Sequence, residues 1–277
     1  MKEFIDAWQG KHVLVAGDPG YDVYHFGHVD RVSPEAPVPV FIEDTIEDRP
    51  GMAYNVCQNL AALGCVPLQL FPPEPWSVKR RFMVGTHQLL RVDKDRWDSP
   101  ISDRPEVDLT SVDAVILSDY AKGWLTDEFC ARIVLACRER SIPCVVDPKL
   151  PDWSKFIGCT VICPNSKEYS ATHHGRVDDG LGKDLSYAFD AVLIKQGAKG
   201  LTLRTNPSGW QDFPATARHV YDVTGAGDTV VATLAAALAA GAHLAQAAQL
   251  ANVAAGWVVG EVGTAACTAE TLKSLCG

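Results

Sequence analysis

The chain has 277 residues, of which 47% are hydrophobic and 21% charged, a composition typical of a folded globular protein and not of a disordered one. Its formal net charge of −9 gives no reason to expect a nucleic acid or an anionic membrane as partner. The first residues lack the pattern of a signal peptide, and the nine cysteines include no CxxC pair. We therefore expect a cytoplasmic protein with reduced thiols, folded as one domain over residues 1–277.

The N-terminal part of the chain contains short apolar runs and one helical pattern. Apolar, β-branched runs predict strands at residues 12–16, 38–42 and 66–71. A Gly-Asp-Pro-Gly loop follows the first of these strands, and a proline-rich segment leads into the second. Apolar residues at helical spacing predict a helix over 53–63, which Gly64 ends. Residues 79–84 and 88–93 alternate in polarity around a Gly-Thr turn and predict a hairpin.

In the second half of the chain, predicted strands and helices alternate. Apolar runs predict strands at 114–117, 144–146, 161–163 and 191–195. A helical pattern at 126–140 separates the first two, and this rhythm is typical of a mostly parallel sheet with helices on both faces. A β-rich stretch follows, with runs at 201–204, 210–213 and 219–221. Polar residues interrupt the apolar stretch 229–259, which therefore predicts two packed helices and not a membrane span.

Polar side chains follow several of these predicted strands. Asp18 and Asp22 come after the first strand, and three later strands are followed by Asp119, Asp147 and Asn165. In open α/β sheets, ligands bind beyond the carboxyl ends of the strands. We therefore expect a ligand cleft along these strand ends.

The segment 222–229 reads Asp-Val-Thr-Gly-Ala-Gly-Asp-Thr and precedes a long apolar helix. Its glycines let the backbone turn tightly, and the free N–H groups of a helix start attract phosphate oxygens or developing negative charge. Asp228, at the same mouth, suits a base that takes a proton from a hydroxyl attacking a γ-phosphorus. The alternative is a glycine-rich turn in which Asp228 only caps a helix.

This segment resembles the C-terminal signature of the ribokinase-like (PfkB-type) carbohydrate kinases. The resemblance implies a three-layer α/β fold with a mostly parallel central sheet, flanking helices and a small β lid. It also implies ATP as the phosphate donor, Mg²⁺ as the metal, and Asp228 as the base. The anion hole would be the turn of Gly225, Ala226 and Gly227.

Other segments resemble the nucleotide side of this family. The string Asn165 to Glu168 is similar to the family's Asn-x-x-Glu element near magnesium and the phosphates, so Glu168 is the implied metal residue, directly or through a water. The string at 195–200 resembles the strand and turn that approach the nucleotide, through Lys195, Gly197 and Gly200. Asn252 falls in a helix that, by resemblance, borders the adenine. A helix cap at Asn165, a plain hairpin turn at 195–200 and a core asparagine at 252 are the alternatives.

The N-terminal half narrows the resemblance to the bacterial heptose 7-phosphate kinases. The matching strings are Arg-Val-Ser-Pro-Glu-Ala-Pro-Val-Pro-Val at 31–40, Arg-Pro-Gly at 49–51, Leu-Ser-Asp-Tyr-Ala-Lys-Gly at 117–123 and Asp-Pro-Lys at 147–149. The resemblance implies transfer of the ATP γ-phosphate to O1 of D-glycero-D-manno-heptose 7-phosphate, for lipopolysaccharide core synthesis. In many bacteria a nucleotidyltransferase domain follows such a kinase, and we expect none within these 277 residues.

The same resemblance assigns the sugar side of the site. Asp22, Gly51 and Asn55 would contact the sugar, because carboxylates and amides bind hydroxyls in fixed directions and glycine allows close approach. The phosphate of the sugar needs cations, for which the candidates are Arg91, Lys149, Lys122 and Arg31. A loop cap at Asp22 and ordinary surface charges are the alternatives. Lid strands drawn from about 22–48 and 79–95 would exclude water, and relatives pair through such lids, so we expect a homodimer.

Two features depart from the family's pattern. Met52 stands where the family has the second glycine of a pair, and it adds bulk near the sugar and the lid hinge. After Phe71 the chain lacks a strand-helix-strand stretch that contains a Gly-x-x-Gly-x-Asp turn, so part of the sugar-side wall is missing. These departures leave two alternatives open: the same chemistry on another sugar or nucleoside, or a sugar- or nucleotide-binding relative without turnover.

Overall fold

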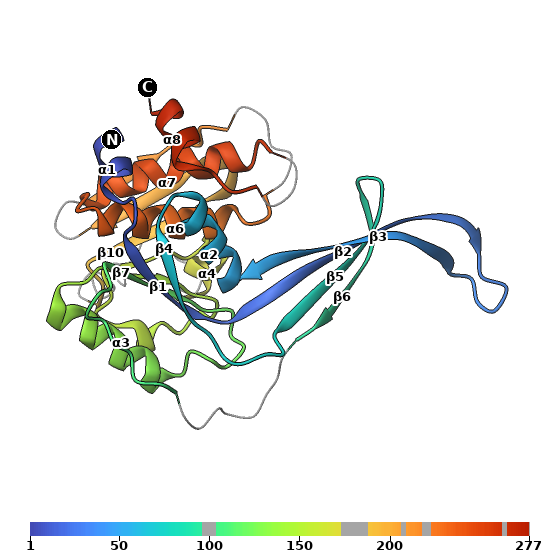
Figure 1. Cartoon of the computed structure of the whole chain (residues 1–277), viewed down its shortest axis with the longest axis horizontal. Helices are drawn as coiled ribbons and strands as arrows, with labels where there is room; N and C mark the ends of the chain where they lie inside the picture. The colour runs from blue at the N-terminus through green and yellow to red at the C-terminus, as the bar shows by residue number, and fades with distance from the viewer. Residues whose placement is uncertain (96–103, 173–187, 206–208, 218–222, 262–264, 277) are drawn as a thin grey trace.

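The central sheet of the computed structural model contains eight strands among the residues described, which are 1–276 without 96–103, 173–187, 206–208, 218–222 and 262–264 (Figure 1). Across the sheet the order is β12 (Gly209–Phe213), β11 (Leu201–Thr205), β10 (Ala191–Lys195), β9 (Val161–Ile162), β8 (Cys144–Asp147), β7 (Ala114–Ser118), β1 (His12–Gly17) and β4 (Val66–Leu70). Neighbours from β4 to β10 run parallel, and β11 and β12 are added antiparallel. The predicted, mostly parallel sheet is confirmed; the predicted strand at 219–221 lies outside the described residues.

Helices cover both faces of this sheet, because successive residues of the strands point to opposite sides and both sides are apolar. Val13 and Val15 of β1 contribute to one core, and Leu14 and Ala16 to the other. The first core is covered by α1 (Lys2–Ala7), α2 (Ala53–Ala62), α6 (Ala226–Ala239), α7 (Leu244–Val258) and α8 (Ala269–Leu275). The second is covered by α3 (Asp127–Arg140), the short helix η1 (Ser154–Phe156) and α4 (Ser166–Thr172). The chain therefore forms three layers.

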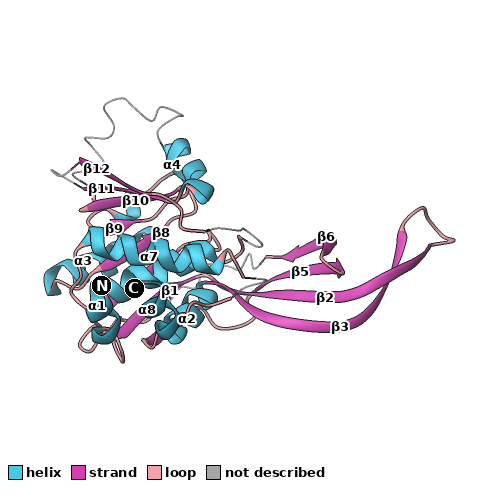
Figure 2. Ribbon diagram, turned by 90° about the horizontal axis from the view of Figure 1, so that it is seen from above, coloured by secondary structure: helices cyan, strands magenta, loops and turns pink. Residues whose placement is uncertain are grey.

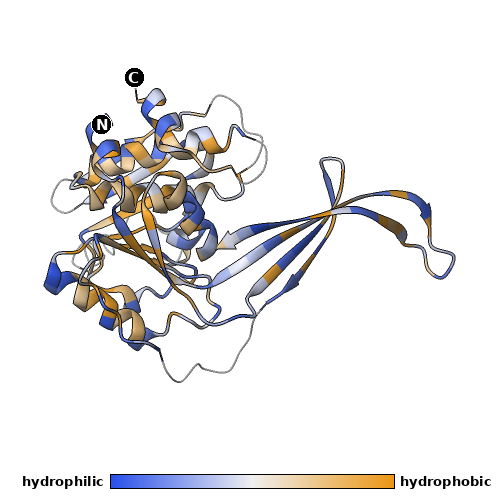
Figure 3. Cartoon of the chain, in the orientation of Figure 1, coloured by the Kyte–Doolittle hydropathy of each residue, from blue (hydrophilic) through white to orange (hydrophobic). Residues whose placement is uncertain are grey.

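A second sheet projects from this body as an arm (Figure 2). Its order is β3 (Pro39–Met52), β2 (Pro19–Val32), β5 (Ser77–Val84) and β6 (His87–Lys94). Strands β2 and β5 run parallel, while the β2–β3 and β5–β6 pairs are antiparallel, which confirms the predicted hairpin around Gly85. Polar and apolar residues alternate along the arm, whereas the strands of the body are apolar (Figure 3). We call this second sheet the lid.

The lid strands lie close to the ranges that the resemblance implies, about 22–48 and 79–95, and are much longer than the apolar runs alone predict. The segment after the first strand was expected to be a loop, but β2 begins at Pro19 and runs for 14 residues. The expected strand at 38–42 is only the start of β3, which continues to Met52. Both segments contain glycine, proline and many charged residues, and these local signals for a loop are outweighed by the ladder that pairs the two strands over their whole length. The proline-rich string at 33–37 is the turn between them.

The region after β4 is closed by an aromatic cluster. Trp76 stacks on Tyr21 at a centroid distance of 5.4 Å and meets Tyr54 and Phe71 edge-on. Its Nε1 donates to the carbonyl of Pro72 at 2.9 Å, which holds the connector between β4 and β5 compact. Strand β4 is the edge of the central sheet and is partly exposed. The chain thus passes directly from the edge strand into the lid.

No helix among the described residues is long and apolar enough to cross a membrane. The helices at 226–239 and 244–258 pack against each other and against the sheet, as the sequence predicts. All nine cysteines are free thiols, and all but Cys276 are buried.

Candidate active site

Asp228 lies in the first turn of α6, whose N-cap is Gly225. Gly225 has a φ of 80°, a left-handed conformation that glycine adopts without strain, so the chain turns sharply into the helix. The first N–H groups of a helix have no partner within the helix and carry the positive end of its dipole. The motif therefore brings an anion-attracting backbone and a buried carboxylate, only 7% exposed, to one helix start.

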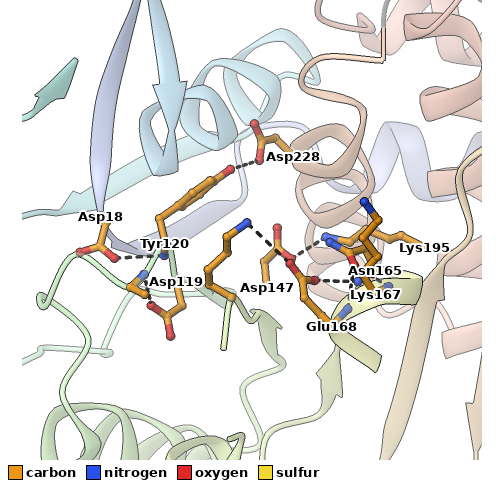
Figure 4. Close-up of polar contacts among 11 residues, drawn as sticks. Asp18, Asp119, Tyr120, Asp147, Asn165, Lys167, Glu168, Lys195 and Asp228 are labelled. Atoms are coloured by element: carbon orange, nitrogen blue, oxygen red, sulfur yellow. Dashed lines mark hydrogen bonds and ion pairs between the residues drawn. The ribbon is translucent and has the colours of Figure 1, made fainter. Parts of the chain in front are cut away.

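Two donors hold the Asp228 carboxylate, and Figure 4 shows the bond from Tyr120. Asn55 of α2 donates from Nδ2 to Oδ2 at 2.7 Å, and the hydroxyl of Tyr120 donates to Oδ1 at 2.9 Å. Burial raises the pKa of Asp228 to about 6, although both hydrogen bonds favour the charged form and oppose that rise. Because Gly225 caps the helix and Asp228 bonds to Asn55 and Tyr120, the alternative of a mere capping aspartate does not describe the structure.

A second polar cluster lies at the ends of β8, β9 and β10 (Figure 4). Asn165 precedes α4, and its Oδ1 accepts from the backbone N–H groups of Lys167 and Glu168 at 2.9 Å. Oε2 of Glu168 accepts from the Asn165 N–H at 2.8 Å, so the pair forms a reciprocal capping box. The other oxygen of Glu168, Oε1, lies 3.9 Å from the Nζ of Lys149. The helix-cap alternative for Asn165 is thus present, and it fixes Glu168 beside the strand ends.

Lys195 connects the two clusters. Its Nζ contacts Asp147 Oδ1 at 2.5 Å. Burial, the largest single influence, lowers the pKa of Lys195, but Asp147 together with Cys163 and Glu168 raises it, and the net shift is upward. A Cβ added at Gly227 would lie 3.5 Å from the same Nζ, so the lysine stands over the start of α6. Within the part of the chain that the structure describes, no three His, Cys, Asp or Glu side chains gather closely enough to hold a metal by themselves.

The third cluster lies on the lid face that carries Asp22, at the root of the arm. Asp22 is buried in strand β2, which excludes the loop-cap alternative, and it forms an ion pair with Arg81 of β5. A Cβ at Gly51 would lie 2.7 Å from Asp22 Oδ2, so this close approach requires glycine at position 51. Lys79, opposite Asp22, has its pKa lowered by burial, and its Nζ lies 5.6 Å from the ring centroid of Tyr120. The lid cluster therefore adjoins the Asp228 cluster.

The four cations predicted from the sequence for the phosphate of the sugar do not form one cluster. Arg91 is on the same lid face, opposite Arg81, and its guanidinium binds Asp93 at 2.7 and 2.6 Å. Lys122 pairs with Asp95 at 2.7 Å, and Arg31 is exposed at the far end of β2. Lys149 is grouped with Glu168 and not with Asp22.

The remaining residues assigned to the nucleotide surround the β10–β11 connection and α7. Gly197 begins the short helix η2 (Gly197–Lys199) and Gly200 follows it, between the antiparallel strands β10 and β11, so the hairpin alternative describes their local structure. Gly200 has a φ of 94°, and a Cβ there would lie 2.1 Å from the carbonyl oxygen of Phe213. Asn252 is buried in α7 and donates from Nδ2 to the carbonyl of Pro214 at 2.8 Å. The predicted contacts of these residues with a nucleotide stay predictions.

Sequence reasoning missed three residues of the site. Tyr120, Lys79 and Arg81 are all brought to Asp228 or Asp22 by tertiary structure. The available signals were weak: Tyr120 follows Asp119 at the end of a predicted strand, and the two cations alternate along a predicted lid strand. Neither signal distinguishes these side chains from ordinary surface residues.

Comparison with known proteins decides the family. Residues 94–272 match the model of the "pfkB family carbohydrate kinase", which is more than half of the chain. The chain belongs to the pfkB family of carbohydrate kinases. The match begins at the end of the lid and includes Glu168, Lys195 and Asp228. As a pfkB member the chain is an ATP-dependent carbohydrate kinase, as the sequence predicts.

The similarity to curated relatives covers the lid as well as the body. The chain is 40% identical to the "Bifunctional protein HldE" of Caulobacter vibrioides and 41% identical to that of Pseudomonas putida, over 97% and 99% of its own length. It spans 64% and 65% of the length of these two relatives. The alignments run over 310 residues, more than this chain contains, so the relatives hold residues without a counterpart here. The position of the missing stretch after Phe71 stays a prediction.

Solved structures with the same fold include two kinases of other sugars. Arabidopsis thaliana ribokinase complexed with ribose and ATP superposes with a TM-score of 0.73 at 17% identity, covering 96% of this chain and 99% of that one. Escherichia coli phosphofructokinase-2 in complex with potassium gives 0.72 at 16%, covering 96% and 98%. These likenesses confirm the predicted ribokinase-like fold.

Proposed function

We propose that this kinase transfers the γ-phosphate of ATP to O1 of D-glycero-D-manno-heptose 7-phosphate or of a close sugar phosphate. The observation that carries the proposal is the buried Asp228 at the start of α6, held by Asn55 and Tyr120 beside the lid. The choice of sugar is supported by the 40% identity to the HldE proteins along nearly the whole chain. It is also supported by the cationic lid face near Asp228.

In the proposed reaction, Asp228 accepts the proton of the acceptor hydroxyl while the hydroxyl oxygen bonds to the γ-phosphorus. The bond from the γ-phosphorus to the bridging oxygen breaks, and ADP leaves. The backbone N–H groups of Gly225, Ala226 and Gly227 stabilise the charge on the transferring group, with Lys195 over the same turn. Asp228 later releases its proton to water.

The donor set suits a hydrated Mg²⁺ held mainly by the ATP phosphates. Mg²⁺ prefers oxygen ligands and usually keeps several waters, so a single protein carboxylate such as Glu168 is sufficient. When bound, the ion neutralises charge on the phosphates. Glu168 is fixed for this role by its capping box with Asn165, and Lys195 is fixed by Asp147. The adenine of ATP would bind near Gly197, Gly200 and Asn252.

The acceptor would lie between the lid and Asp228. Asp22 and Asn55 would supply polar groups to the sugar, and Gly51 leaves the room that the Asp22 carboxylate occupies. The phosphate of the sugar would be bound by Lys79 and Arg81 together with Arg91, since all three alternate onto the lid face that carries Asp22. Lys149 stays a candidate from the side of Glu168.

We also propose that two copies pair through the opposite, outer face of the lid. On that face Ile46 lies beside His25, Leu90 pairs with Phe82, and Val92 pairs with Arg80. The exposed fractions of Ile46, Leu90 and Val92 are 53%, 55% and 42%. A sheet face with this much exposed apolar surface is a typical interaction site. We propose that the lid of a second copy covers this face. The proposed location of the protein is the cytoplasm.

The decisive test is acceptor-dependent ADP release from the purified protein with Mg·ATP and D-glycero-D-manno-heptose 7-phosphate. Asp228→Asn should keep ATP binding and lower the rate by roughly 10²–10⁴-fold, as expected for loss of a positioned base. The exposed Asp108→Asn is the matched control and should retain activity. Near-normal turnover by Asp228→Asn would refute the mechanism.

A different acceptor is the second candidate, and the missing stretch after Phe71 favours it, because the sugar-side wall is shortened there. Release of ADP with another sugar or a nucleoside, and none with the heptose phosphate, would support this alternative. ATP-induced thermal stabilisation without transfer to any acceptor of a broad panel would support a non-catalytic binding protein.

A further inference from the structure

Tyr120 is held in place by a buried carboxylate that the proposed reaction does not use. Asp18 lies between β1 and β2 and is only 2% exposed. Its Oδ2 accepts from the backbone N–H groups of Tyr120 and Lys122, both at 3.0 Å, and its Oδ1 accepts from that of Trp124 at 3.2 Å. The loop after β7 is thus wrapped around one side chain, which fixes the backbone from which the tyrosine ring extends (Figure 4).

We propose that Tyr120 is a positioning residue: its hydroxyl orients the Asp228 carboxylate, and Asp18 holds Tyr120 in this position. The inference rests on the proposed role of Asp228 in phosphate transfer. It assigns to Tyr120 no contact with the acceptor or with ATP.

Geometry supports this role. A carboxylate has two oxygens, and Asn55 and Tyr120 donate to one each, so the group cannot rotate without losing a bond. Each oxygen keeps a further lone pair, which leaves room for an acceptor hydroxyl. Burial raises the pKa of Tyr120 well above its ordinary value, so the phenol stays a neutral donor at neutral pH.

The electrostatic consequence follows from the charges around Asp228. Asp147 disfavours ionisation of Asp228, and Lys195 favours it. The Nζ of Lys79 lies 5.6 Å from the centroid of the Tyr120 ring, and the charge of Asp22 acts on the Tyr120 hydroxyl. Hydrogen bonds from Asn55 and Tyr120 oppose the effect of burial, which is the largest influence. Removing the phenol oxygen removes one of these two donors and leaves the surrounding charges unchanged.

The test is Tyr120→Phe, which keeps the ring and deletes only its oxygen. The ¹³C-carboxyl resonance of Asp228 in aspartate-labelled protein is identified by its loss in Asp228→Asn and is titrated in both tyrosine forms without any substrate. We expect the midpoint to rise by about half a pH unit or more in Tyr120→Phe, as for loss of a bond to the charged form. Tyr21→Phe, whose hydroxyl bonds to Glu74 on the other face of the lid, is the matched control and should leave the midpoint unchanged.

Kinetics provide the second measurement. With an acceptor that is turned over, Tyr120→Phe should lower kcat by about tenfold, leave the KM for ATP unchanged, and move the acid limb of kcat/KM to higher pH. An unchanged Asp228 midpoint in the labelled protein would overturn the inference, whatever the kinetics. An absence of ADP release from the wild-type protein would count against the proposed function alone, because the titration needs no acceptor.

Discussion

At the scale of single residues, the burial that suits Asp228 to its proposed role lowers the stability of the folded protein. Its folded-state pKa of about 6 lies above the ordinary value of 3.8, because burial disfavours the charged form. Between these two values the folded protein binds the proton more tightly than the unfolded chain does. The free energy of unfolding therefore falls as the pH rises from about 4 to about 6, and it is level above that range. Ionisation of this one group opposes folding by roughly 3 kcal/mol, at about 1.4 kcal/mol per pKa unit.

This argument predicts a pH-dependent difference between the wild-type protein and Asp228→Asn. The wild-type protein should lose up to roughly 3 kcal/mol of stability relative to the variant between pH 4 and pH 7, because asparagine does not ionise. Urea unfolding at several pH values measures the difference, and a constant offset from the lost or altered hydrogen bonds does not affect its pH dependence. Two stability curves that run parallel across this range would contradict the assignment of a raised pKa.

The sequence predicted some of these residues because their roles are local. Gly225 and Asp228 are recognisable from one eight-residue segment, and Asn165 and Glu168 from a four-residue string that resembles the family's Asn-x-x-Glu element. Tyr120 could not be found in this way, since its bond to Asp228 joins positions 108 residues apart. Nothing in the neighbourhood of a tyrosine in the sequence indicates which distant carboxylate it meets.

At the scale of elements, the strands of the body are recognisable from local sequence, whereas those of the lid depend on distant partners. The buried strands of the body consist of continuous apolar runs, so their positions were predicted within one or two residues. Strands β2 and β3 carry Gly, Pro and charged residues, and their pairing with each other and with β5 stabilises them. Such strands are specified by their partners and not by their own composition. The apolar runs alone therefore locate the lid strands but not their ends, whereas the resemblance implies bounds of about 22–48 and 79–95.

Met52 illustrates how this long pairing constrains the hinge between β3 and α2. Its φ of 58° lies in the region that favours glycine, and its side chain is buried over Gly20, where a Cβ would lie 2.6 Å from its sulfur. The side chain of Met52 therefore packs against Gly20, where strand β2 leaves the body. Burial of the methionine offsets a backbone strain of about 1–3 kcal/mol.

Two substitutions at this position separate burial from strain. Met52→Ala loses the buried side chain and keeps the strain, whereas Met52→Gly loses the side chain and relieves it. We expect Met52→Gly to be more stable than Met52→Ala by about 1 kcal/mol, the reverse of the usual order for these residues. Urea unfolding of the two variants measures this difference. An alanine variant at least as stable as the glycine variant would show that the backbone at position 52 is not strained.

At the scale of the whole molecule, the proposed pairing of lids has a simple test. Ile46 and Thr45 are adjacent and exposed on β3 but point to opposite faces of the sheet. Ile46→Glu places a charge on the apolar outer face and should convert a dimer to a monomer in sedimentation at micromolar concentration. Thr45→Glu adds the same charge to the other face and should leave the mass unchanged. A monomeric wild-type protein, or a dimer in both variants, would refute the pairing.

The lid joins the body at a point where two chain segments are hydrogen-bonded to each other. The chain leaves the body through Asp18 and returns through Ala53, and the Ala53 N–H donates to the Asp18 carbonyl at 3.1 Å. Asp18 anchors the loop of Tyr120, and Ala53 begins the helix that carries Asn55, so both supports of the Asp228 carboxylate start at this one crossing. The root of the arm is therefore shared with the two side chains that hold the proposed base. Any change in the angle between arm and body at this crossing would displace Asn55 and Tyr120 together.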